Sequence, residues 1–404
     1  MVMREQSLRK VVMPGVGDLL RRPRINFGDE QFLMFVLDKM AYDYEQQYDD
    51  VIRLTLGKSE LPADASITEA MVKAARAFDK SALVFPAGLP QLREKLAAHE
   101  SKRHGIAISP DNVIISVGTS TLFRNLFALL AKDGDEVLLP LPYYPLYRFS
   151  AMLADANIRY YRIDLPSMRL DVDSFRENFT EATRLVVLNS PGNPLGNVLT
   201  REELAAVDRI VAGSAVIICD QIYDNICFDD LAPSMLTVAG ARSNLILTNA
   251  FSKGYRMYAR RIGYAVVPDA LIEPLTVVQH HTLLTADPIP QFGALAALDR
   301  PEDVAELAAR YRGRRDYTLH RFERVPGVRA LPARGSFYMT LDCRGVMAER
   351  GFASSLAVAT AIMEDTHVAT VPGSDFGLPE TLRLSFTSSR YEEGIDRLVS
   401  FFTA

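Results

Sequence analysis

Short apolar runs alternate with amphipathic stretches through the middle of the chain. The apolar runs have few polar interruptions, which is typical of strands buried on both faces of a largely parallel sheet. Stretches such as TLFRNLFALLAK and TREELAAVDRIVAG repeat apolar positions every three or four residues and predict helices. In the second helix, Thr200 and Glu203 form a capping box and Gly213 is the expected C-cap. Strands are predicted at 112–117, 136–140, 158–163, 184–189, 215–220, 244–249 and 263–268.

The two ends of the chain have a different pattern. A helix predicted over 29–47 leads to the apolar run IRLTLG at 52–57, and a long helix predicted over 301–324 precedes strand signals in SFYMTL and TLRLSF. We therefore expect an α/β fold with a mainly parallel central sheet flanked by helices, together with a smaller α+β domain. The expected division is an N-terminal arm and part of the small domain at 1–64, a large domain at 65–295, and the rest of the small domain at 296–404.

Composition excludes several classes of function. The net charge of -5 over 404 residues argues against a nucleic-acid-binding protein, which usually carries a basic excess. Apolar runs stay shorter than a membrane span and the N-terminus shows no signal peptide, so we expect a cytoplasmic protein without a membrane partner. The three cysteines fit a reducing compartment, and the six histidines form no cluster with metal-ligand spacing. No metal is expected.

Ligands of open α/β sheets bind beyond the carboxyl ends of the strands, so the residues that follow each strand are the candidates for chemistry. After 112–117, Gly118, Thr119 and Ser120 open a helix; this pattern suits an anion site and equally a plain helix cap. After 136–140, the segment PYYPLY supplies Tyr144, as a platform for a flat ring or as core packing.

Three further strands are followed by polar side chains. Asn193 lies in the rigid loop SPGNPLG after 184–189, and Asp220 ends the run 215–220, with Tyr223 three residues on. Lys253 follows 244–249, and Arg261 comes eight residues after it. A lone strand-end aspartate is usually a helix cap, and a lone basic segment is usually a solvated turn.

Together these features are the parts needed to hold pyridoxal phosphate. A lysine forms an imine with the aldehyde and later moves the proton at the substrate Cα. An aspartate keeps the pyridine nitrogen protonated, so that the ring can accept the electrons of a carbanion. Asparagine and tyrosine donate to the phenolic oxygen, while an arginine and a helix N-terminus hold the phosphate.

The chain resembles the class I/II aminotransferases of the fold-type I pyridoxal phosphate-dependent enzymes over nearly its whole length. The motifs are FPAGLPQLREKLA, PYYPLY, NSPGNPLG, DQIYD, FSKGYRMYARRIG, RGSFYMTL and VPGSDFG followed by LRLSF. The resemblance implies an aldimine at Lys253, pairing of Asp220 with the pyridine nitrogen, and contacts from Asn193 and Tyr223 to the phenolic oxygen. It also implies that Tyr144 stacks on the ring. The residues implied around the phosphate are Gly118, Thr119, Ser120, Ser252 and Arg261.

The same resemblance implies how substrate is held and how the protein assembles. Arg383 would bind the α-carboxylate of an amino-acid substrate, with Gly57 and Asn193 lining the same pocket. A homodimer with shared active sites is implied. The expected activity is that of an aminotransferase acting on an α-amino acid through the Lys253 aldimine and a Cα carbanion, or quinonoid, intermediate.

Several positions depart from the family pattern. Ala250 stands where a serine or glycine is usual, Arg256 where a small or aliphatic residue is usual, and Gln221 where a glutamate is common. Arg256 is either a surface charge or a contact of the phosphate or of an acidic substrate group. The tyrosine that the partner subunit often supplies has no clear counterpart; Leu83 and Phe85 are nearest.

A second function remains open. PYYP and NPLG are similar to segments of 1-aminocyclopropane-1-carboxylate synthases, although the acidic segment of that group is replaced here by LGKSELP. A lyase or synthase of the same fold, performing γ-elimination or γ-replacement on an S-adenosylmethionine-like substrate, is therefore the alternative. The motifs themselves do not separate these reactions.

Overall fold

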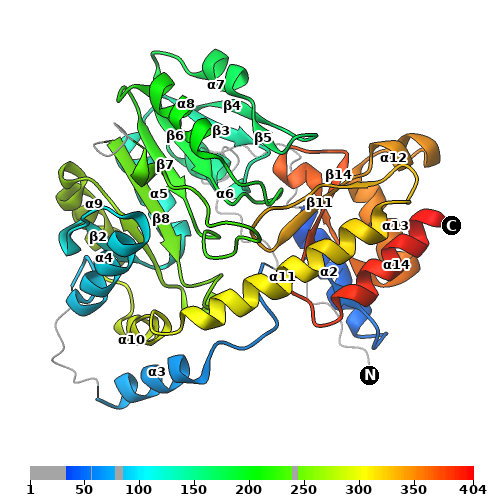
Figure 1. The fold of residues 1–404 in the computed structure, drawn as a ribbon, viewed down its shortest axis with the longest axis horizontal. Coiled ribbons are helices and arrows are strands. Elements are labelled where there is room, and N and C mark those ends of the chain that lie inside the picture. The colour runs from blue at the N-terminus through cyan, green and yellow to red at the C-terminus, as the bar shows by residue number, and fades with distance from the viewer. Residues whose placement is uncertain (1–32, 56, 78–84, 239–243) are drawn as a thin grey trace, which may run out of the picture. The chain divides into compact units, whose positions relative to one another are not determined.

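A computed structural model describes residues 33–404 except 56, 78–84 and 239–243, and residues 33–404 form one compact unit. Its largest element is an eight-stranded sheet with the order β2-β9-β8-β7-β6-β3-β4-β5 (Figure 1). Neighbouring strands from β8 to β4 pair in parallel, whereas the β2–β9, β9–β8 and β4–β5 pairs are antiparallel. The strands are β2 (Val113–Ser116), β3 (Glu136–Leu141), β4 (Asn157–Asp164), β5 (Arg169–Leu170), β6 (Thr183–Asn189), β7 (Val216–Asp220), β8 (Leu245–Ala250) and β9 (Gly263–Val266).

Helices cover both faces of this sheet. Because side chains alternate along a strand, Ile217 and Cys219 of β7 enter one hydrophobic cluster and Ile218 enters another. The cluster of Ile218 includes residues of α5, α6 and α9, and the other includes residues of α3, α4, α7, α8 and α10. The helices are α3 (Ala65–Ala77), α4 (Pro90–His104), α5 (Gly118–Leu130), α6 (Pro145–Leu153), α7 (Val172–Asn178), α8 (Arg201–Val211), α9 (Asp269–Leu283) and α10 (Pro288–Ala297).

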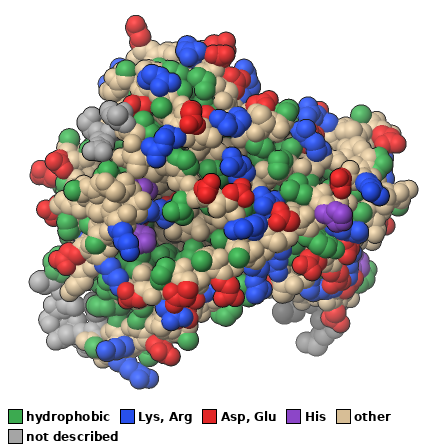
Figure 2. All heavy atoms as spheres, in the orientation of Figure 1, with side chains coloured by type: hydrophobic (Ala, Val, Ile, Leu, Met, Phe, Trp, Pro, Cys, Tyr) green, Lys and Arg blue, Asp and Glu red, His purple; other side chains and the backbone are tan. Residues whose placement is uncertain are grey.

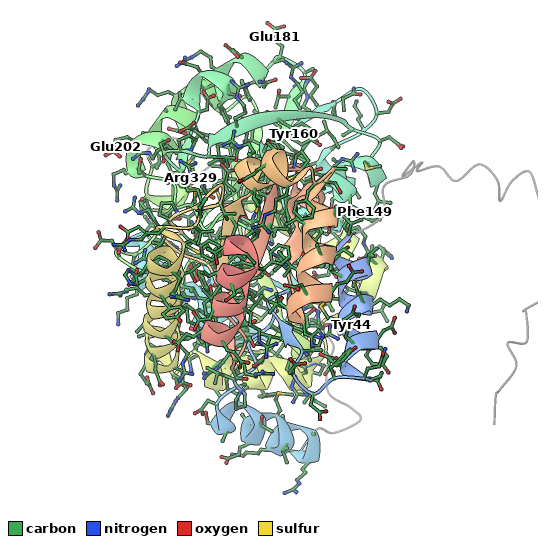
Figure 3. The ribbon with its side chains drawn as sticks, turned by 90° about the vertical axis from the view of Figure 1, so that its right-hand side faces the viewer. Tyr44, Phe149, Tyr160, Glu181, Glu202 and Arg329 are labelled. Carbon is green, nitrogen blue, oxygen red and sulfur yellow. The ribbon has the colours of Figure 1, made fainter. Side chains whose placement is uncertain are left out.

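A second region joins the first described helix to the C-terminal part of the chain. It contains a four-stranded antiparallel sheet with the order β10-β11-β14-β13 and a short parallel pair of β1 with β12. Figure 3 shows α11, α14, α13 and α2 side by side, with Tyr44 on α2. The elements are α2 (Leu33–Glu45), β1 (Ile52–Arg53), α11 (Pro301–Phe322), β10 (Arg329–Ala330), β11 (Tyr338–Asp342), α12 (Arg344–Arg350), α13 (Ser355–Thr366), β12 (Val368–Ala369), β13 (Val371–Pro372), β14 (Thr381–Ser385) and α14 (Tyr391–Thr403).

The seven strands predicted in the middle of the chain are all present, with ends that differ by at most two residues. The run IRLTLG forms only the two-residue β1, since its single partner β12 is equally short. The capping box at Thr200 is confirmed, but the C-cap of α8 is Ala212, and Gly213 follows it with a second positive φ. The division at 1–64, 65–295 and 296–404 stays a prediction, and residues 1–32 lie outside the described part.

Two surface properties bear on the excluded functions. Acidic and basic side chains are interspersed over the face that Figure 2 shows. Within the described residues no single helix is long and apolar enough to cross a membrane. The pair α12 and α13, bent by 78°, has together the length and composition of a span, which is weak evidence for one.

The capping box gives a direct test of the local fold. In α8, the Thr200 hydroxyl accepts from the Glu203 N–H, and the Glu203 carboxylate accepts from the Thr200 N–H. Thr200→Ala should destabilise the first turn of α8 by about 1 kcal/mol. Hydrogen exchange of the α8 amides should then be about fivefold faster, whereas Thr200→Ser should exchange like the wild type. Equal exchange in the alanine variant would contradict the assigned cap.

Candidate active site

The carboxyl ends of β6, β7 and β8 open onto a cavity of about 610 Å³. The segments that follow β1, β2 and β3, the start of α2, and residues of β11 and β14 form the rest of its wall. All the predicted site residues except Gly118 line this cavity, and Gly118 lies beside it against the Arg261 guanidinium. The predicted residues in the wall are Gly57, Thr119, Ser120, Tyr144, Asn193, Asp220, Tyr223, Ser252, Lys253, Arg261 and Arg383.

Lys253 places its amine inside the cavity. The Nζ atom donates to the Gly57 carbonyl oxygen at 2.7 Å and lies 5.1 Å from the centre of the Phe337 ring. Burial lowers the pKa of the amine to about 7, and the charges of Arg383 and Arg261 act in the same direction. A lysine with this pKa is partly neutral near pH 7, so it can act as a nucleophile and as a base.

Asp220 ends β7 and is 3% exposed. Its Oδ2 accepts from the Tyr147 hydroxyl at 2.7 Å and its Oδ1 accepts from the Ile222 N–H at 3.2 Å. Burial nevertheless raises the pKa of the carboxyl to about 6. A cation placed against Asp220 would restore its ionised form, since an opposite charge favours the charged state.

The start of α5 has the features that an anion site requires. Its N-cap, Val117, supplies no side-chain hydrogen bond, so no cap occupies the first N–H groups of the helix and they can donate to an anion. The hydroxyls of Thr119, Ser120 and Ser252 have no hydrogen-bond partner in the described part of the chain. Gly118 has a φ of +68°, and a Cβ there would overlap the Arg261 guanidinium, so glycine allows this close approach.

Arg383 is held rigidly at the opposite wall. Its Nη1 donates to the Asn193 side chain at 3.2 Å and its Nη2 donates to the Thr55 carbonyl at 2.9 Å. The guanidinium carbon lies 4.1 Å from the centre of the Tyr338 ring and 4.8 Å from that of Phe376. The Nε atom is buried with no partner among described residues. A planar cation fixed in this way and left with an unused donor suits a carboxylate.

Two tyrosines, the half-buried Tyr144 and the buried Tyr223, also line this wall. Burial raises the pKa of Tyr144 to about 12 and raises that of Tyr223 well above its usual value. Both phenols therefore remain protonated donors at neutral pH. Tyr144 lies at the N-cap of α6, and the ring of Tyr223 packs edge-on against that of Tyr338.

The unusual positions lie outside the cavity wall. Arg256 pairs with Asp303 of α11 at 3.5 Å, and its side chain is 15% exposed, so it is not a solvated surface charge. Ala250 is buried at the end of β8, and the Gln221 Oε1 accepts from the Ser234 hydroxyl at 3.4 Å. Phe85 does not line the cavity, and Leu83 lies outside the described residues.

Several wall residues were missed by the sequence analysis. Tyr147 stands one helical turn after Tyr144, and that spacing places it on the same side of the helix. Tyr258, between Lys253 and Arg261, could have been suspected from its position in the motif. The α2 residues gave no signal, because only the tertiary fold brings them to the sheet. The missed residues are Met34, Phe35, Asp38, Thr55, Lys58, Tyr147, Asn189, Ile222, Tyr258 and Tyr338.

Comparison with known proteins decides the family. The model of the family Aminotransferase class I and II matches residues 49–402. The chain belongs to the class I and II aminotransferases. This aminotransferase is 27% identical to an aspartate aminotransferase of Bacillus sp. (strain YM-2), with 89% of this chain and 94% of the relative covered. It is 30% identical to a probable aspartate/prephenate aminotransferase of Aquifex aeolicus, with 86% and 90% covered.

The solved structures agree. The aminotransferase superposes on the crystal structure of the Thermotoga maritima aspartate aminotransferase with a TM-score of 0.86 at 27% identity, covering 93% of this chain and 98% of the other. The fold is therefore fold type I, as predicted. The enzyme is a pyridoxal phosphate-dependent transferase, and the lyase alternative is not favoured.

The residues of the cavity fit this cofactor. The uncapped start of α5 with Arg261 suits its phosphate, and the buried carboxyl of Asp220 needs a cation such as a protonated ring nitrogen. Lys253 offers a partly neutral amine for the aldehyde. The same wall thus provides each kind of group that the cofactor requires.

The Tyr147–Asp220 hydrogen bond predicts how cofactor affinity depends on pH. Tyr147→Phe removes a donor to the carboxylate, worth about 1.5–3 kcal/mol, and so raises the pKa of Asp220. With Asp220 paired to the ring nitrogen, as predicted, cofactor binding needs the ionised acid, so affinity should fall about tenfold at pH 7 and the low-pH loss of affinity should begin at a higher pH. Tyr161→Phe is the control, because this equally buried hydroxyl donates to Val187 away from the cavity. Equal affinities for the two variants would contradict the assigned contact.

The lowered pKa of Lys253 can be measured directly. Only the neutral amine reacts, so reductive methylation of the cofactor-free protein should modify Lys253 with a midpoint near pH 7. A model lysine, with a pKa of about 10.4, provides the reference in the same reaction. Peptide mass spectrometry across pH 5–10 follows the modification. A Lys253 profile that coincides with the reference would show that the amine is not depressed by burial.

Proposed function

We propose that Lys253 binds the cofactor covalently and then moves the proton at the substrate Cα. The observation that supports this is the enclosed amine, which has a pKa of about 7 and shares one cavity with the Asp220 carboxyl and the Arg383 guanidinium. When bound, pyridoxal phosphate supplies an aldehyde and an electron-accepting ring. The lysine can accept a proton near neutral pH and return it, as transfer of an amino group requires.

The remaining wall residues would hold and orient the cofactor. Asp220 would hold the protonated ring nitrogen, and Tyr223 and Asn193 would donate to the ring oxygen. Tyr144 would lie against the ring. The phosphate would be held by Gly118, Thr119, Ser120, Ser252 and Arg261.

Arg383 would bind the α-carboxylate of the amino acid. Its two Nη contacts and the two flanking rings fix the guanidinium before substrate arrives, so little conformational entropy is lost on binding. Gly57 fits the same part of the wall, because a Cβ there would lie 2.8 Å from the Tyr338 hydroxyl oxygen.

We propose that one amino-acid substrate and its 2-oxo acid product each carry a second carboxylate. Two similar proteins are named for aspartate and prephenate, both of which carry a second carboxylate. In this chain Lys58 lines the cavity next to Gly57 and has no hydrogen bond or ion pair with a described residue. The carboxylate of Asp38, which also lines the cavity, accepts from the Thr55 hydroxyl at 2.8 Å and lies 3.5 Å from the Arg53 guanidinium. Lys58 is thus the cation available for a side-chain carboxylate.

We further propose a cytoplasmic homodimer. The described cysteines Cys219, Cys227 and Cys343 are unpaired, as expected in a reducing compartment.

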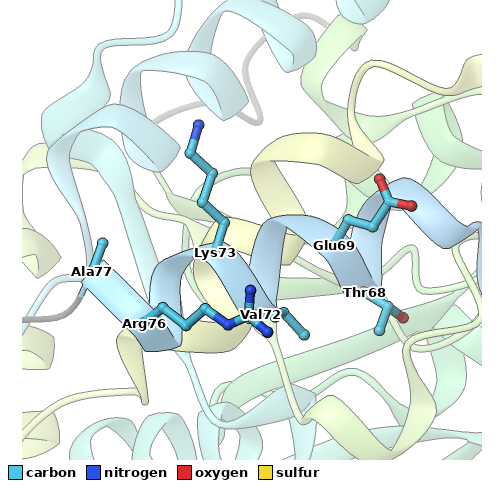
Figure 4. Close-up of a pocket in the computed structure, with 6 residues that line it drawn as sticks. All are labelled: Thr68, Glu69, Val72, Lys73, Arg76 and Ala77. Atoms are coloured by element: carbon cyan, nitrogen blue, oxygen red, sulfur yellow. The ribbon is translucent and has the colours of Figure 1, made fainter.

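The outer face of α3 is a candidate contact surface for the homodimer: Val72 is 44% exposed, and Figure 4 shows Glu69 and Lys73 projecting from the same side. A hollow of about 540 Å³ over this helix is lined by α3 alone, so it carries no convergent chemistry.

Spectral titration with amino donors tests the proposed function. Aspartate and glutamate should convert the bound cofactor to its amino form, and a 2-oxo acid should reverse the change. Lys58→Met should raise the aspartate concentration that half-converts the cofactor by about fivefold, as expected for a partly exposed ion pair. The concentration of alanine that half-converts it should not change. Lys58→Arg should behave like the wild type. A Lys58→Met variant that weakens aspartate and alanine equally would exclude the specificity role.

A further inference from the structure

A buried ionic cluster adjoins the segments that form the cavity wall, but its residues do not line the cavity. Arg103 and Glu100 come from α4, Asp224 follows Tyr223 in the turn after β7, and Asn249 lies in β8. Glu100, Asp224 and Asn249 are between 0% and 2% exposed. None of them lines the 610 Å³ cavity, so the roles proposed above leave the cluster without a function.

Arg103 holds the turn that carries Tyr223. Its Nη2 donates to the Asp224 carbonyl at 3.0 Å and lies 3.3 Å from the Asp224 carboxylate, while its Nη1 donates to the Asn225 side chain. Burial acts to raise the pKa of Asp224, and Arg103 opposes this. The guanidinium therefore binds both the backbone and the side chains of this turn.

The same cluster reaches the segment that carries Lys253. The Asn249 side chain donates to the Asp224 carboxylate at 3.0 Å and accepts from the Ala250 N–H at 2.7 Å, three residues before the lysine. A Cβ on Gly254, the residue after Lys253, would lie 3.4 Å from the Asn225 Cβ. The turn of Tyr223 and the loop of Lys253 thus rest on one set of buried contacts.

Glu100 anchors the cluster to the helix and the sheet. Its carboxylate accepts from the Tyr264 hydroxyl of β9 at 2.5 Å and lies 2.9 Å from the His104 Nε2. Burial acts to raise the pKa of Glu100, but these two hydrogen bonds and the charges of His104 and Arg103 outweigh it, so the pKa is lowered. Buried ion pairs contribute little stability compared with apolar residues, whereas a network of this kind specifies one geometry.

We propose that Arg103 and Asp224 form a positioning pair that fixes the Tyr223 phenol relative to the Lys253 amine. This inference rests on the proposed contact of Tyr223 with the ring oxygen of the cofactor. Arg103 acts through Tyr223 and touches neither cofactor nor substrate. Without it, the hydroxyl of Tyr223 loses its fixed direction.

The experiment compares Arg103→Met, Tyr223→Phe and the double variant. The readouts are the pH midpoint of the cofactor's near-visible absorbance and the separate values of kcat and KM. Each single variant should shift the midpoint in the same direction by about half a unit or more, and Arg103→Met should lower kcat about tenfold with KM within about twofold. The double variant should shift no further than Tyr223→Phe, because the two residues act on the same hydroxyl.

Matched variants separate positioning from stability. Arg93→Met removes an arginine from the same helix, one whose Nε donates to the Val113 carbonyl at 2.9 Å, and should leave the midpoint unchanged. Asp224→Asn keeps the shape of the pair and should shift the midpoint as Arg103→Met does, which keeps the test decisive if the methionine variant does not fold. If Tyr223→Phe shifts the midpoint but Arg103→Met and Asp224→Asn do not, the positioning role would be overturned. Additive shifts in the double variant would also overturn it, whereas an unshifted Tyr223→Phe would remove the proposed role of Tyr223 itself.

Discussion

Burial of the Lys253 amine is the constraint on which the rest of the site depends. Desolvation of this amine, together with the charges of the nearby Arg383 and Arg261, lowers its pKa to about 7. The same enclosure raises the pKa of Asp220 to about 6. The half-buried base and the buried acid both have pKa values shifted toward neutrality. Each is stabilised by a partner of opposite charge or by a covalent bond, and a pyridine aldehyde offers both.

The sheet makes this enclosure possible. Asp220 and Lys253 follow neighbouring parallel strands, so their side chains meet at one edge without long loops. The anion site at α5 follows β2, and β2 is joined to β8 through the antiparallel β9. The proposed phosphate donors and the lysine therefore lie on one sheet. Arg383, the proposed ligand of the substrate carboxylate, comes from β14 of the other sheet.

Much of this arrangement could be predicted because its signals are local. Buried strands appear as apolar runs, and the residues after each strand are fixed in space by the direction of the sheet, which is why Asp220 and Lys253 could be placed together. Met34, Asp38 and Lys58 could not be placed, because only the packing of α2 and of the segment after β1 brings them to the cavity. The partner of Arg256 was missed for the same reason: Asp303 lies on α11, some fifty residues further along the chain.

Borohydride reduction of the cofactor-loaded enzyme, followed by digestion and mass spectrometry, tests the central claim most directly. Reduction makes the lysine–cofactor bond permanent, so the label marks the lysine that held it. The structure predicts a single labelled peptide, containing Lys253. A label on another lysine, or an unlabelled Lys253 in enzyme that retains its cofactor, would contradict the account.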